Sequence, residues 1–346
     1  MRLSMQLSYA GGFKEAVDQV VSLEKAGLDI VWVAEAYGFD APSFMGYLAA
    51  RTERVEIGSG IMPIYSRTPA LLAQTAAGID YISDGRCILG LGASGPQVIE
   101  GWHGVAYTEP LARTREIIDI CRRVWRREVL TNEGRYTIPL PPEQGTGLGK
   151  ALKIMSHPVR DRIPIYVASL GPKNVQMTAE VADGWLPLLF VPERAKAVWG
   201  ESLAKAAANR DAGLAPLEVA AGGLVAIGDD VDAERIRDFL RPMVALYVGG
   251  MGARGRNFYN DLASRYGYEK EAATIQDLYL DGKKTEAAAA VPAEMLEKMS
   301  LVGSEGYVKE RLAAFAEAGV TVLSVQPVSP DPVGTIEQLK GWAEHL

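Results

Sequence analysis

Short apolar runs and amphipathic segments alternate along almost the whole chain. The apolar runs are rich in Val, Ile and Leu, which predicts strands buried on both faces. The segments between them have helical periodicity and often close on a glycine, as Ala26-Gly27 does. The predicted strands cover residues 3–9, 28–34, 55–61, 87–91, 164–169, 184–190, 217–227 and 320–327. The predicted helices cover residues 13–27, 42–52, 68–83, 172–182, 191–211, 231–248, 306–318 and 332–346, and another long helix opens at 108–110.

Strands that alternate with helices predict a parallel sheet with right-handed crossovers. Eight such units favour an α/β fold of the closed (β/α)8 TIM barrel type over an open doubly wound sheet, which usually has fewer strands. We therefore expect residues 1–346 to form one barrel domain. Regular pattern is lost at about 128–161 and again at about 249–300, where only residues 286–290 form a helical run. Both stretches are predicted to be insertions.

Composition and charge narrow the function classes. The chain has 346 residues, 48% of them hydrophobic and 23% charged, and a net charge of −7, which indicates a soluble protein without a nucleic-acid surface. Its two cysteines and three histidines are too scattered for a disulfide framework or a metal site. No stretch has the apolar length of a signal peptide or membrane span, so we expect a cytoplasmic protein with no membrane partner. Six arginines between 113 and 127 interleave with Glu116 and Asp119, which is typical of a solvated helix face.

The carboxyl ends of the predicted strands carry the candidate chemistry, because barrel enzymes hold their sites there. The fourth strand ends in GLGASGP, residues 90–96, where missing Cβ atoms would let a flat ligand or a phosphate approach the backbone. Its letters match GxGxxG, but Pro96 follows at once, the next convincing helix starts near 108, and the dinucleotide fingerprint belongs in the first βα turn. We therefore predict a cofactor site of another kind. The other strand ends bring Tyr9, Glu35, residues 60–61 and residues 169–171 to the same edge.

Three segments give the chain a resemblance to the bacterial luciferase-like superfamily. Within it, the chain is most similar to the coenzyme F420-dependent oxidoreductases of the methylenetetrahydromethanopterin reductase-like branch. The segments are GSGIMPIYSRTPALLAQTAAGIDYISDGRCILGLGASGP at 58–96, GWHG at 101–104 and ASLGPKNVQMTAEVADGWLP at 168–187. The resemblance covers nearly the whole chain and implies the same barrel, the deazaflavin F420 as cofactor and a homodimer. FMN is the alternative cofactor, since it also has a phosphate and a similar ring.

The resemblance also implies which residues hold the cofactor. The third strand of such enzymes ends in a bulge with a non-proline cis peptide behind the ring, here at Gly60-Ile61; without the resemblance, Gly58 and Gly60 would merely bend a strand. Many members have an acidic residue that touches the cofactor at the position of Glu35. The cofactor phosphate of such enzymes lies where a helix begins, because the free N–H groups and the dipole of the helix favour an anion. Lys173 could add positive charge there, but it could equally be a plain surface lysine. The full set is Glu35, Gly60, Ile61, Gly92, Ala93, Ser94, Gly95, Ser169, Leu170, Gly171, Pro172 and Lys173.

His103 and Glu35 are the candidate catalytic residues. An imidazole titrates near neutral pH and suits protonating a reduced product, while a histidine held by packing is the plainer alternative. Oxidation of glucose 6-phosphate is not expected, because the histidine that follows the acidic residue in those members is Ala36 here. Their second acidic residue is also missing, since residues 94–96 are Ser-Gly-Pro.

Aromatic side chains are predicted to form a flat wall for the substrate. Trp32 precedes a strand end and is either part of this wall or core. The predicted substrate residues are Tyr9, Tyr37, Tyr65 and Trp102.

Hydride transfer between F420 and a small organic substrate is the function that these residues predict. A deazaflavin carries the hydride at one ring carbon, so the protein chiefly positions two faces and excludes water. Two alternatives stay open: an FMN-dependent monooxygenase that works with a separate flavin reductase, and a non-catalytic flavin-binding relative. Stretches 128–161 and 249–300 are expected to shape the substrate pocket, and neither contains a motif that names the substrate.

Overall fold

The computed structural model describes residues 1–7 and 12–345, and its strands close into a parallel barrel. The barrel order is β1, β2, β3, β5, β6, β7, β8 and β10, and β10 pairs with β1 to close it. β4 continues β3 beyond a bulge, and β9 pairs with β8 outside the ring. The predicted TIM barrel is confirmed. The strands are β1 (Arg2–Leu7), β2 (Ile30–Val33), β3 (Glu56–Ser59), β4 (Met62–Pro63), β5 (Cys87–Gly92), β6 (Ile165–Ala168), β7 (Gly184–Leu186), β8 (Glu218–Ile227), β9 (Leu301–Gly303) and β10 (Val322–Pro327).

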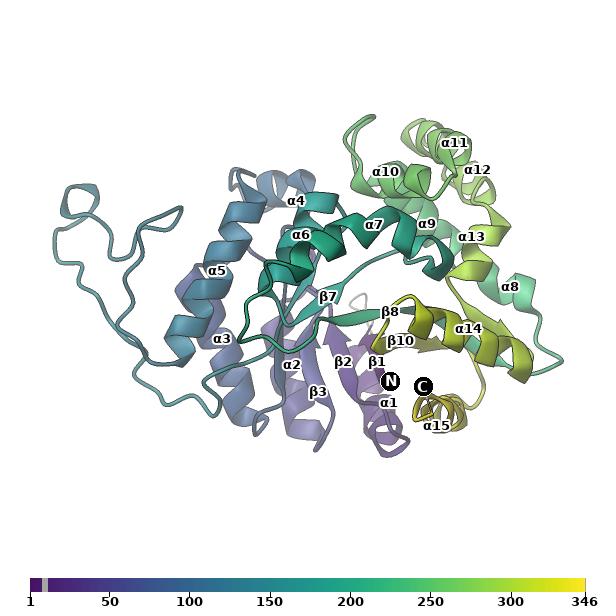
Figure 1. Cartoon of the computed structure of the whole chain (residues 1–346), viewed down its shortest axis with the longest axis horizontal. Helices are drawn as coiled ribbons and strands as arrows, with labels where there is room; N and C mark the ends of the chain where they lie inside the picture. The colour runs from purple at the N-terminus through teal and green to yellow at the C-terminus, as the bar shows by residue number, and fades with distance from the viewer. Residues whose placement is uncertain (8–11, 346) are drawn as a thin grey trace.

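Helices surround the barrel and begin at the signals that the sequence carries (Figure 1). Asp40 and Thr68 accept backbone N–H groups of the helices that follow them, each with proline in the first turn. The two chain ends lie side by side, and the Met1 amine donates to the Ala343 carbonyl at 2.7 Å. The surrounding helices are α1 (Phe13–Lys25), α2 (Ala41–Arg51), α3 (Pro69–Ile82), α4 (Pro96–Gly101), α5 (Pro110–Trp125), α6 (Pro172–Val181), α7 (Pro192–Ala207), α14 (Glu305–Glu317) and α15 (Pro332–Ala343).

The helices depart from the prediction in three places. A short helix, α4, opens directly at Pro96, where none was expected. The single helix predicted at 231–248 is divided into α8 (Ala233–Asp238), α9 (Arg241–Ala245) and a π-helical turn, Leu246–Gly250. The stretch 249–300 is largely helical. Gly267 and Gly282, both with a left-handed backbone, end its first two helices, so each helix is too short to show a clear helical periodicity of apolar residues. Its helices are α10 (Phe258–Arg265), α11 (Glu269–Leu280), α12 (Lys284–Ala289) and α13 (Ala293–Lys298).

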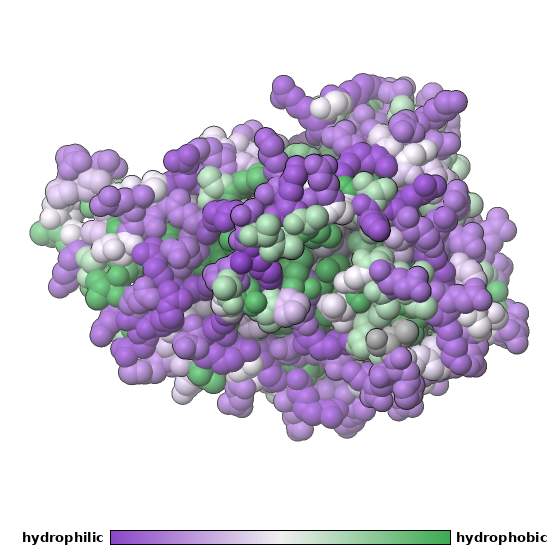
Figure 2. Space-filling view, in the orientation of Figure 1, coloured by the Kyte–Doolittle hydropathy of each residue, from purple (hydrophilic) through white to green (hydrophobic). Residues whose placement is uncertain are grey.

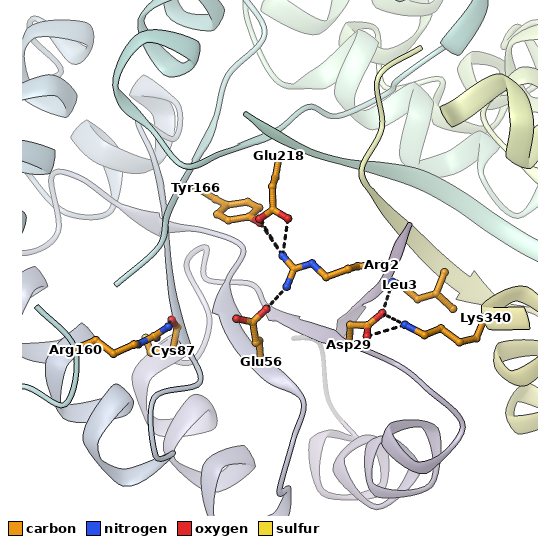
Figure 3. Close-up of polar contacts among 9 residues, drawn as sticks. All are labelled: Arg2, Leu3, Asp29, Glu56, Cys87, Arg160, Tyr166, Glu218 and Lys340. Carbon is orange, nitrogen blue, oxygen red and sulfur yellow. Dashed lines mark hydrogen bonds and ion pairs between the residues drawn. The ribbon is translucent and has the colours of Figure 1, made fainter. Parts of the chain in front are cut away.

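The stretch 128–161 forms an excursion that extends away from the barrel, at the left of Figure 1. It contains the 3-10 turn η1 (Pro142–Gln144) and two isolated bridges, 130 with 152 and 132 with 138, as its irregular pattern predicted. Leu148 and Met155 are 84% and 92% exposed, and apolar atoms are visible on this part of the surface in Figure 2. Arg160 anchors the returning chain, because it pairs with buried Asp80 and donates to the Cys87 carbonyl at 2.7 Å (Figure 3).

Aromatic rings fill the barrel interior. Trp32 and Tyr166 lie 5.3 Å apart inside it, and a Cβ atom at Gly58 or Gly184 would lie 2.3 Å from one of these rings. Trp32 is 2% exposed and therefore belongs to the core. Glycine is required at these two strand positions because the large rings occupy the space of a neighbouring side chain.

Charged groups close the amino-terminal end of the barrel (Figure 3). Arg2 pairs with Glu56 and Glu218, the latter at 2.9 Å, and donates to the Tyr166 hydroxyl at 3.1 Å. Burial, followed by the nearby Glu218 carboxylate, raises the pKa of Tyr166. With this end closed by side chains, we expect a ligand to enter the barrel from the carboxyl ends of the strands.

Glu24 ties α1 to the start of β3 and supplies a pH-dependent part of the stability. Its carboxylate accepts backbone N–H groups of Glu53, Arg54 and Val55, the last at 2.6 Å; burial opposes ionisation, but these bonds prevail and lower the pKa of Glu24. A carboxyl group with a lowered pKa in the folded state stabilises the fold when the pH is above its ordinary pKa of about 4.3. This stabilisation is lost as the pH falls through the folded-state pKa. We expect Glu24→Gln to lower the unfolding free energy by about 2 kcal/mol at neutral pH and by less below about pH 4.

Urea unfolding at pH 7 and pH 3.5 measures this difference, and Glu15→Gln, on the exposed face of α1, is the matched control. A Glu24→Gln deficit of equal size at both pH values would show that lost packing, and not the charge, is responsible.

Candidate active site

The predicted cofactor residues come together at the open end of the barrel. β4 pairs with β5 and β5 with β6, so the chain segments that follow these strands are neighbours. The structure therefore places residues 60–61, 92–95 and 169–173 along one side of the mouth. Tyr9, one of the predicted substrate residues, lies outside the described residues.

Gly60 and Ile61 are joined by a cis peptide bond, at the place that the resemblance implied. The bond lies between β3 and β4, and the Gly60 N–H donates to the Val33 carbonyl at 2.8 Å. A Cβ atom at Gly60 would lie 3.0 Å from the Gln6 side-chain oxygen and 3.1 Å from Cβ of Trp32. The bulge thus packs closely on β1 and β2, and it presents the Ile61 side chain to β5.

The glycines at the end of β5 and in the turn after it are required for different reasons. A Cβ atom at Gly90 would lie 1.7 Å from the Ser59 carbonyl oxygen, and the Ser59 hydroxyl bridges the N–H and carbonyl of Gly90 at 2.9 and 2.8 Å. A Cβ atom at Gly92 would lie 2.8 Å from the Ile61 side chain. Ser94 has a left-handed backbone with φ of 58°, and Gly95 is the N-cap residue directly before α4. Contacts between strands thus explain the first two glycines of the GxGxxG letters.

The loop between β6 and α6 is held rigidly from behind. The Ser169 hydroxyl lies 2.9 Å from that of Thr178, and two indole N–H groups, of Trp185 and Trp199, donate to the carbonyls of Ser169 and Leu170 at 2.8 Å. Gly171 precedes α6 without a side-chain cap, so the first N–H groups of this helix can face a ligand. Lys173 is exposed beside them. This end of the loop suits an anion such as a phosphate.

Glu35 forms a bidentate ion pair with Arg67. Its two oxygens accept from the Arg67 guanidinium at 2.6 and 2.9 Å, and one of them also accepts the Ala41 N–H at 2.7 Å. The side chains are 7% and 13% exposed. Both carboxylate oxygens are therefore occupied, which favours a fixed charge that positions Arg67 and the start of α2. Arg67 was missed by the sequence prediction, although it stands in the segment 58–96 as a single arginine between a strand end and a helix start.

Two glutamines on the inner wall were also missed. The hydroxyls of Ser4 and Ser324 meet at 2.9 Å across β1 and β10, inside the barrel. Gln6 and Gln326 stand two positions further along the same strands, on the same face, and both are exposed. Exposed side chains on the inner face of a barrel lie in its open mouth. The signal was the alternation of Arg2, Ser4 and Gln6 with apolar residues in β1.

The predicted aromatic wall consists of two groups. Tyr37 and Trp102 are each 66% exposed, and their rings lie 6.4 Å apart at the rim. Tyr65 is buried, donates to the Thr108 carbonyl at 2.8 Å and lies 5.2 Å from the Tyr107 ring. Burial raises the pKa of Tyr65 to about 12, so its hydroxyl stays neutral. The first group can close over a ligand, whereas the second forms a fixed side wall.

His103 follows α4 and is half-buried. Its N–H on the backbone donates to the Val98 carbonyl at 3.2 Å, which fixes the position of the residue. The Nε2 atom of its ring is buried and makes no hydrogen bond to the described residues. This ring nitrogen is therefore free of protein partners within the structure described.

Other chemistry is limited. Across residues 1–7 and 12–345, no three His, Cys, Asp or Glu side chains are grouped so as to hold a metal ion. Cys87 and Cys121 are buried, and burial raises the pKa of both thiols, which leaves them unreactive. None of the helices in the described part combines the length and apolar character needed to cross a bilayer.

Comparisons with known proteins show the family of the chain. A family model described as luciferase-like monooxygenase matches residues 1–322. A protein of Mycobacterium tuberculosis, provisionally named a coenzyme F420-dependent oxidoreductase, is 41% identical over 346 residues, which cover 98% of this chain and 99% of that protein. The 5,10-methylenetetrahydromethanopterin reductase of Archaeoglobus fulgidus is 30% identical over 324 residues, 91% of this chain and 90% of the reductase.

A solved structure shows the same fold. The F420-dependent tetrahydromethanopterin reductase of Methanopyrus kandleri has a TM-score of 0.75 at 22% identity, with 98% of this chain and 97% of that chain covered. The chain therefore belongs to the luciferase-like family, in the branch that contains the methylenetetrahydromethanopterin reductases.

Proposed function

We propose that the protein is an oxidoreductase that transfers a hydride between coenzyme F420 and a small organic substrate. The observation that carries the proposal is the Gly60-Ile61 bulge packed against Gly92 at the barrel mouth, with the uncapped start of α6 beside it. This arrangement offers a flat backbone surface next to an anion site. A tricyclic ring with a phosphate-bearing chain fits both parts. The relatives named above support F420 as the cofactor.

The residues at the mouth have separate tasks in this proposal. The bulge and the turn at 92–95 support one face of the ring, and residues 169–173 hold the phosphate. The amide of Gln6 supplies hydrogen-bonding groups toward the polar edge of the ring, and the ion pair of Glu35 and Arg67 is a fixed polar wall beside it. The bound cofactor supplies the hydride chemistry at one ring carbon, so the chain needs no nucleophile of its own.

The remaining task is to place the substrate and handle a proton. Tyr37 and Trp102 stand exposed at the rim, where they can cover a substrate and exclude water. His103 holds a ring nitrogen that no described protein group occupies, so it can hold or release the proton that accompanies hydride transfer. Glu35 acts through Arg67 and does not need to move a proton.

Equilibrium binding tests the proposal directly. We expect F420, titrated into the purified protein while its fluorescence is followed, to bind at least tenfold more tightly than FMN under the same conditions. Tight FMN binding with weak F420 binding would contradict the proposal and favour the monooxygenase alternative. Oxygen uptake with reduced FMN would then identify that reaction. Tight F420 binding without oxidation or reduction of any enone, imine or alcohol would favour a non-catalytic carrier.

A further inference from the structure

A second pocket opens beside the barrel mouth, on the side of the excursion. Its volume is about 300 Å³, and its walls come from the start of α3, from the chain after α4, from the first turn of α5 and from the excursion. The residues that matter for its chemistry are Tyr65, Arg67, Thr68, Val105, Arg113 and Tyr136. The pocket has cationic and hydroxyl groups on its walls and no acidic side chain among its lining residues.

Arg113 supplies the available positive charge. Arg115, Arg122, Arg123 and Arg126 on or after the same helix each pair with an acid, but within the described chain Arg113 has no ion pair. The acid at the same helix start, Glu109, is paired with Arg135 at 2.6 Å. Arg67 is occupied by Glu35.

Its surroundings hold Arg113 in place. The Arg113 guanidinium lies over the rings of Tyr65 and Tyr136, 5.8 and 5.2 Å from their centroids, and its Nε donates to the Thr108 carbonyl at 3.0 Å. One terminal nitrogen also donates to the Thr108 hydroxyl at 3.4 Å, and a hydrogen bond to the Tyr136 side chain raises the pKa of Arg113. These contacts orient the planar cation, and its remaining N–H groups can meet an anion.

The far wall of the pocket is built by the excursion. Glu116 was expected to pair with arginine side chains, but its carboxylate instead accepts the backbone N–H groups of Arg135 and Tyr136 at 2.9 Å, and also the Asn132 amide. Burial opposes ionisation of Glu116, yet these hydrogen bonds prevail and lower its pKa. The carboxylate thus stays charged and holds Tyr136 against Arg113. The half-buried Glu116 thus fixes the backbone of the excursion next to Arg113.

The pocket is separated from the predicted cofactor turn by two rings. Tyr65 forms its wall, the Tyr107 ring lies 5.2 Å further on, and the Tyr107 hydroxyl donates to the Ser94 carbonyl at 3.4 Å. Arg113 and the turn therefore lie on either side of these two rings, and a ligand that uses both has a substituent that passes the rings.

We propose that Arg113 forms an anion subsite that binds a carboxylate or phosphate group of a ligand held in the barrel mouth. The proposal rests on the proposed function, because it takes the mouth as the ligand site. The charged group belongs either to the substrate or to the acidic part of the cofactor, and the pocket recognises both by the same chemistry. Planar bidentate contact with a guanidinium favours carboxylate and phosphate over uncharged groups.

Binding by three variants tests the subsite. Arg113→Gln removes the charge, Arg113→Lys keeps it, and Arg126→Gln is a matched control, since Arg126 is exposed and pairs with Glu128 at 2.7 Å. Each protein is titrated with F420, with a deazaflavin that lacks the phosphate, and with glutarate and uncharged glutaramide. Thermal unfolding of each variant reports whether the fold is retained.

Two results support the subsite. If the anion belongs to the cofactor, Arg113→Gln weakens F420 binding by about tenfold or more and leaves the phosphate-free deazaflavin unchanged. If it belongs to the substrate, F420 binding is unchanged, while glutarate binds the wild-type protein in preference to glutaramide and this preference is lost in Arg113→Gln. Arg113→Lys keeps the charge but loses the planar fork, so it retains only part of the binding in either case.

Two results overturn it. Equal binding of every ligand by wild type, Arg113→Gln and Arg126→Gln would remove the subsite. Equal losses of charged and uncharged ligands in Arg113→Gln would assign Arg113 a packing role only. Failure of the wild-type protein to bind F420 contradicts the proposed function and not the subsite, because the glutarate and glutaramide titrations of the protein alone still decide it.

Discussion

Replacing Arg67 by methionine is expected to lower the unfolding free energy by about 3–5 kcal/mol, because it leaves the buried carboxylate of Glu35 without its partner. The ion pair is nearly enclosed, with 7% and 13% of its side chains exposed, so water cannot take over the lost contacts. Urea unfolding at pH 7 measures the change. The control is Arg51→Met, whose exposed pair with Asp18 should change the unfolding free energy far less.

The double variant Glu35→Gln with Arg67→Met separates charge from packing. A glutamine keeps an acceptor for the Ala41 N–H but has no charge, so the double variant should recover about 2 kcal/mol relative to Arg67→Met alone. If the unfolding free energy lost in the double variant equals the sum of the losses in Glu35→Gln and Arg67→Met, the two residues are not coupled.

Replacing Gly90 by alanine is expected to destabilise the protein by more than about 4 kcal/mol and to leave little folded protein. The added methyl would lie 1.7 Å from the Ser59 carbonyl oxygen, and that oxygen belongs to the backbone of a barrel strand that cannot move aside. The yield of soluble protein and its circular dichroism measure the outcome. Gly78→Ala is the control, since nothing lies within 4 Å of its Cβ position on α3 and alanine there should stabilise the helix by about 1 kcal/mol.

Gly92→Ala should behave differently, although it stands only two residues further along. Its methyl would meet the end of the Ile61 side chain at 2.8 Å, and a side chain can shift at a cost of about 1–3 kcal/mol. The displaced Ile61 would then enter the mouth, so we expect folded protein with F420 binding weakened by tenfold or more. Unchanged binding in a folded Gly92→Ala protein would show that Ile61 does not face the cofactor.

The barrel was predictable because strand and helix signals are local. Apolar runs, capping residues such as Thr68 and helix-ending glycines each act within a few positions, and eight repeats of one unit leave few architectures. The helical stretch 249–300 was missed for the opposite reason. Its helices are short, and their periods are cut by Gly267 and Gly282 before a pattern accumulates.

The site was predictable only as far as motifs extend. The cis bond at Gly60-Ile61 followed from a resemblance, since no local rule requires it. Arg67 and Gln326 depend on partners far away in sequence: Glu35 stands 32 positions from Arg67, and Gln326 reaches the mouth because β10 closes on β1. Such relations exist only after the barrel has formed.

The adjacent chain ends and the exposed excursion make the fold suitable for circular permutation. The Met1 amine contacts the Ala343 carbonyl, and residues 142–150 at the tip of the excursion are all exposed. A circularly permuted chain, opened between 147 and 148 and joined by a short linker at the old ends, would cut no strand or helix of the described fold. The permuted chain would begin with β6 and end after α5, and β1 would be the next strand after β10 along the chain. Barrel closure, now a contact between the two ends of the chain, would become a connection between sequence neighbours.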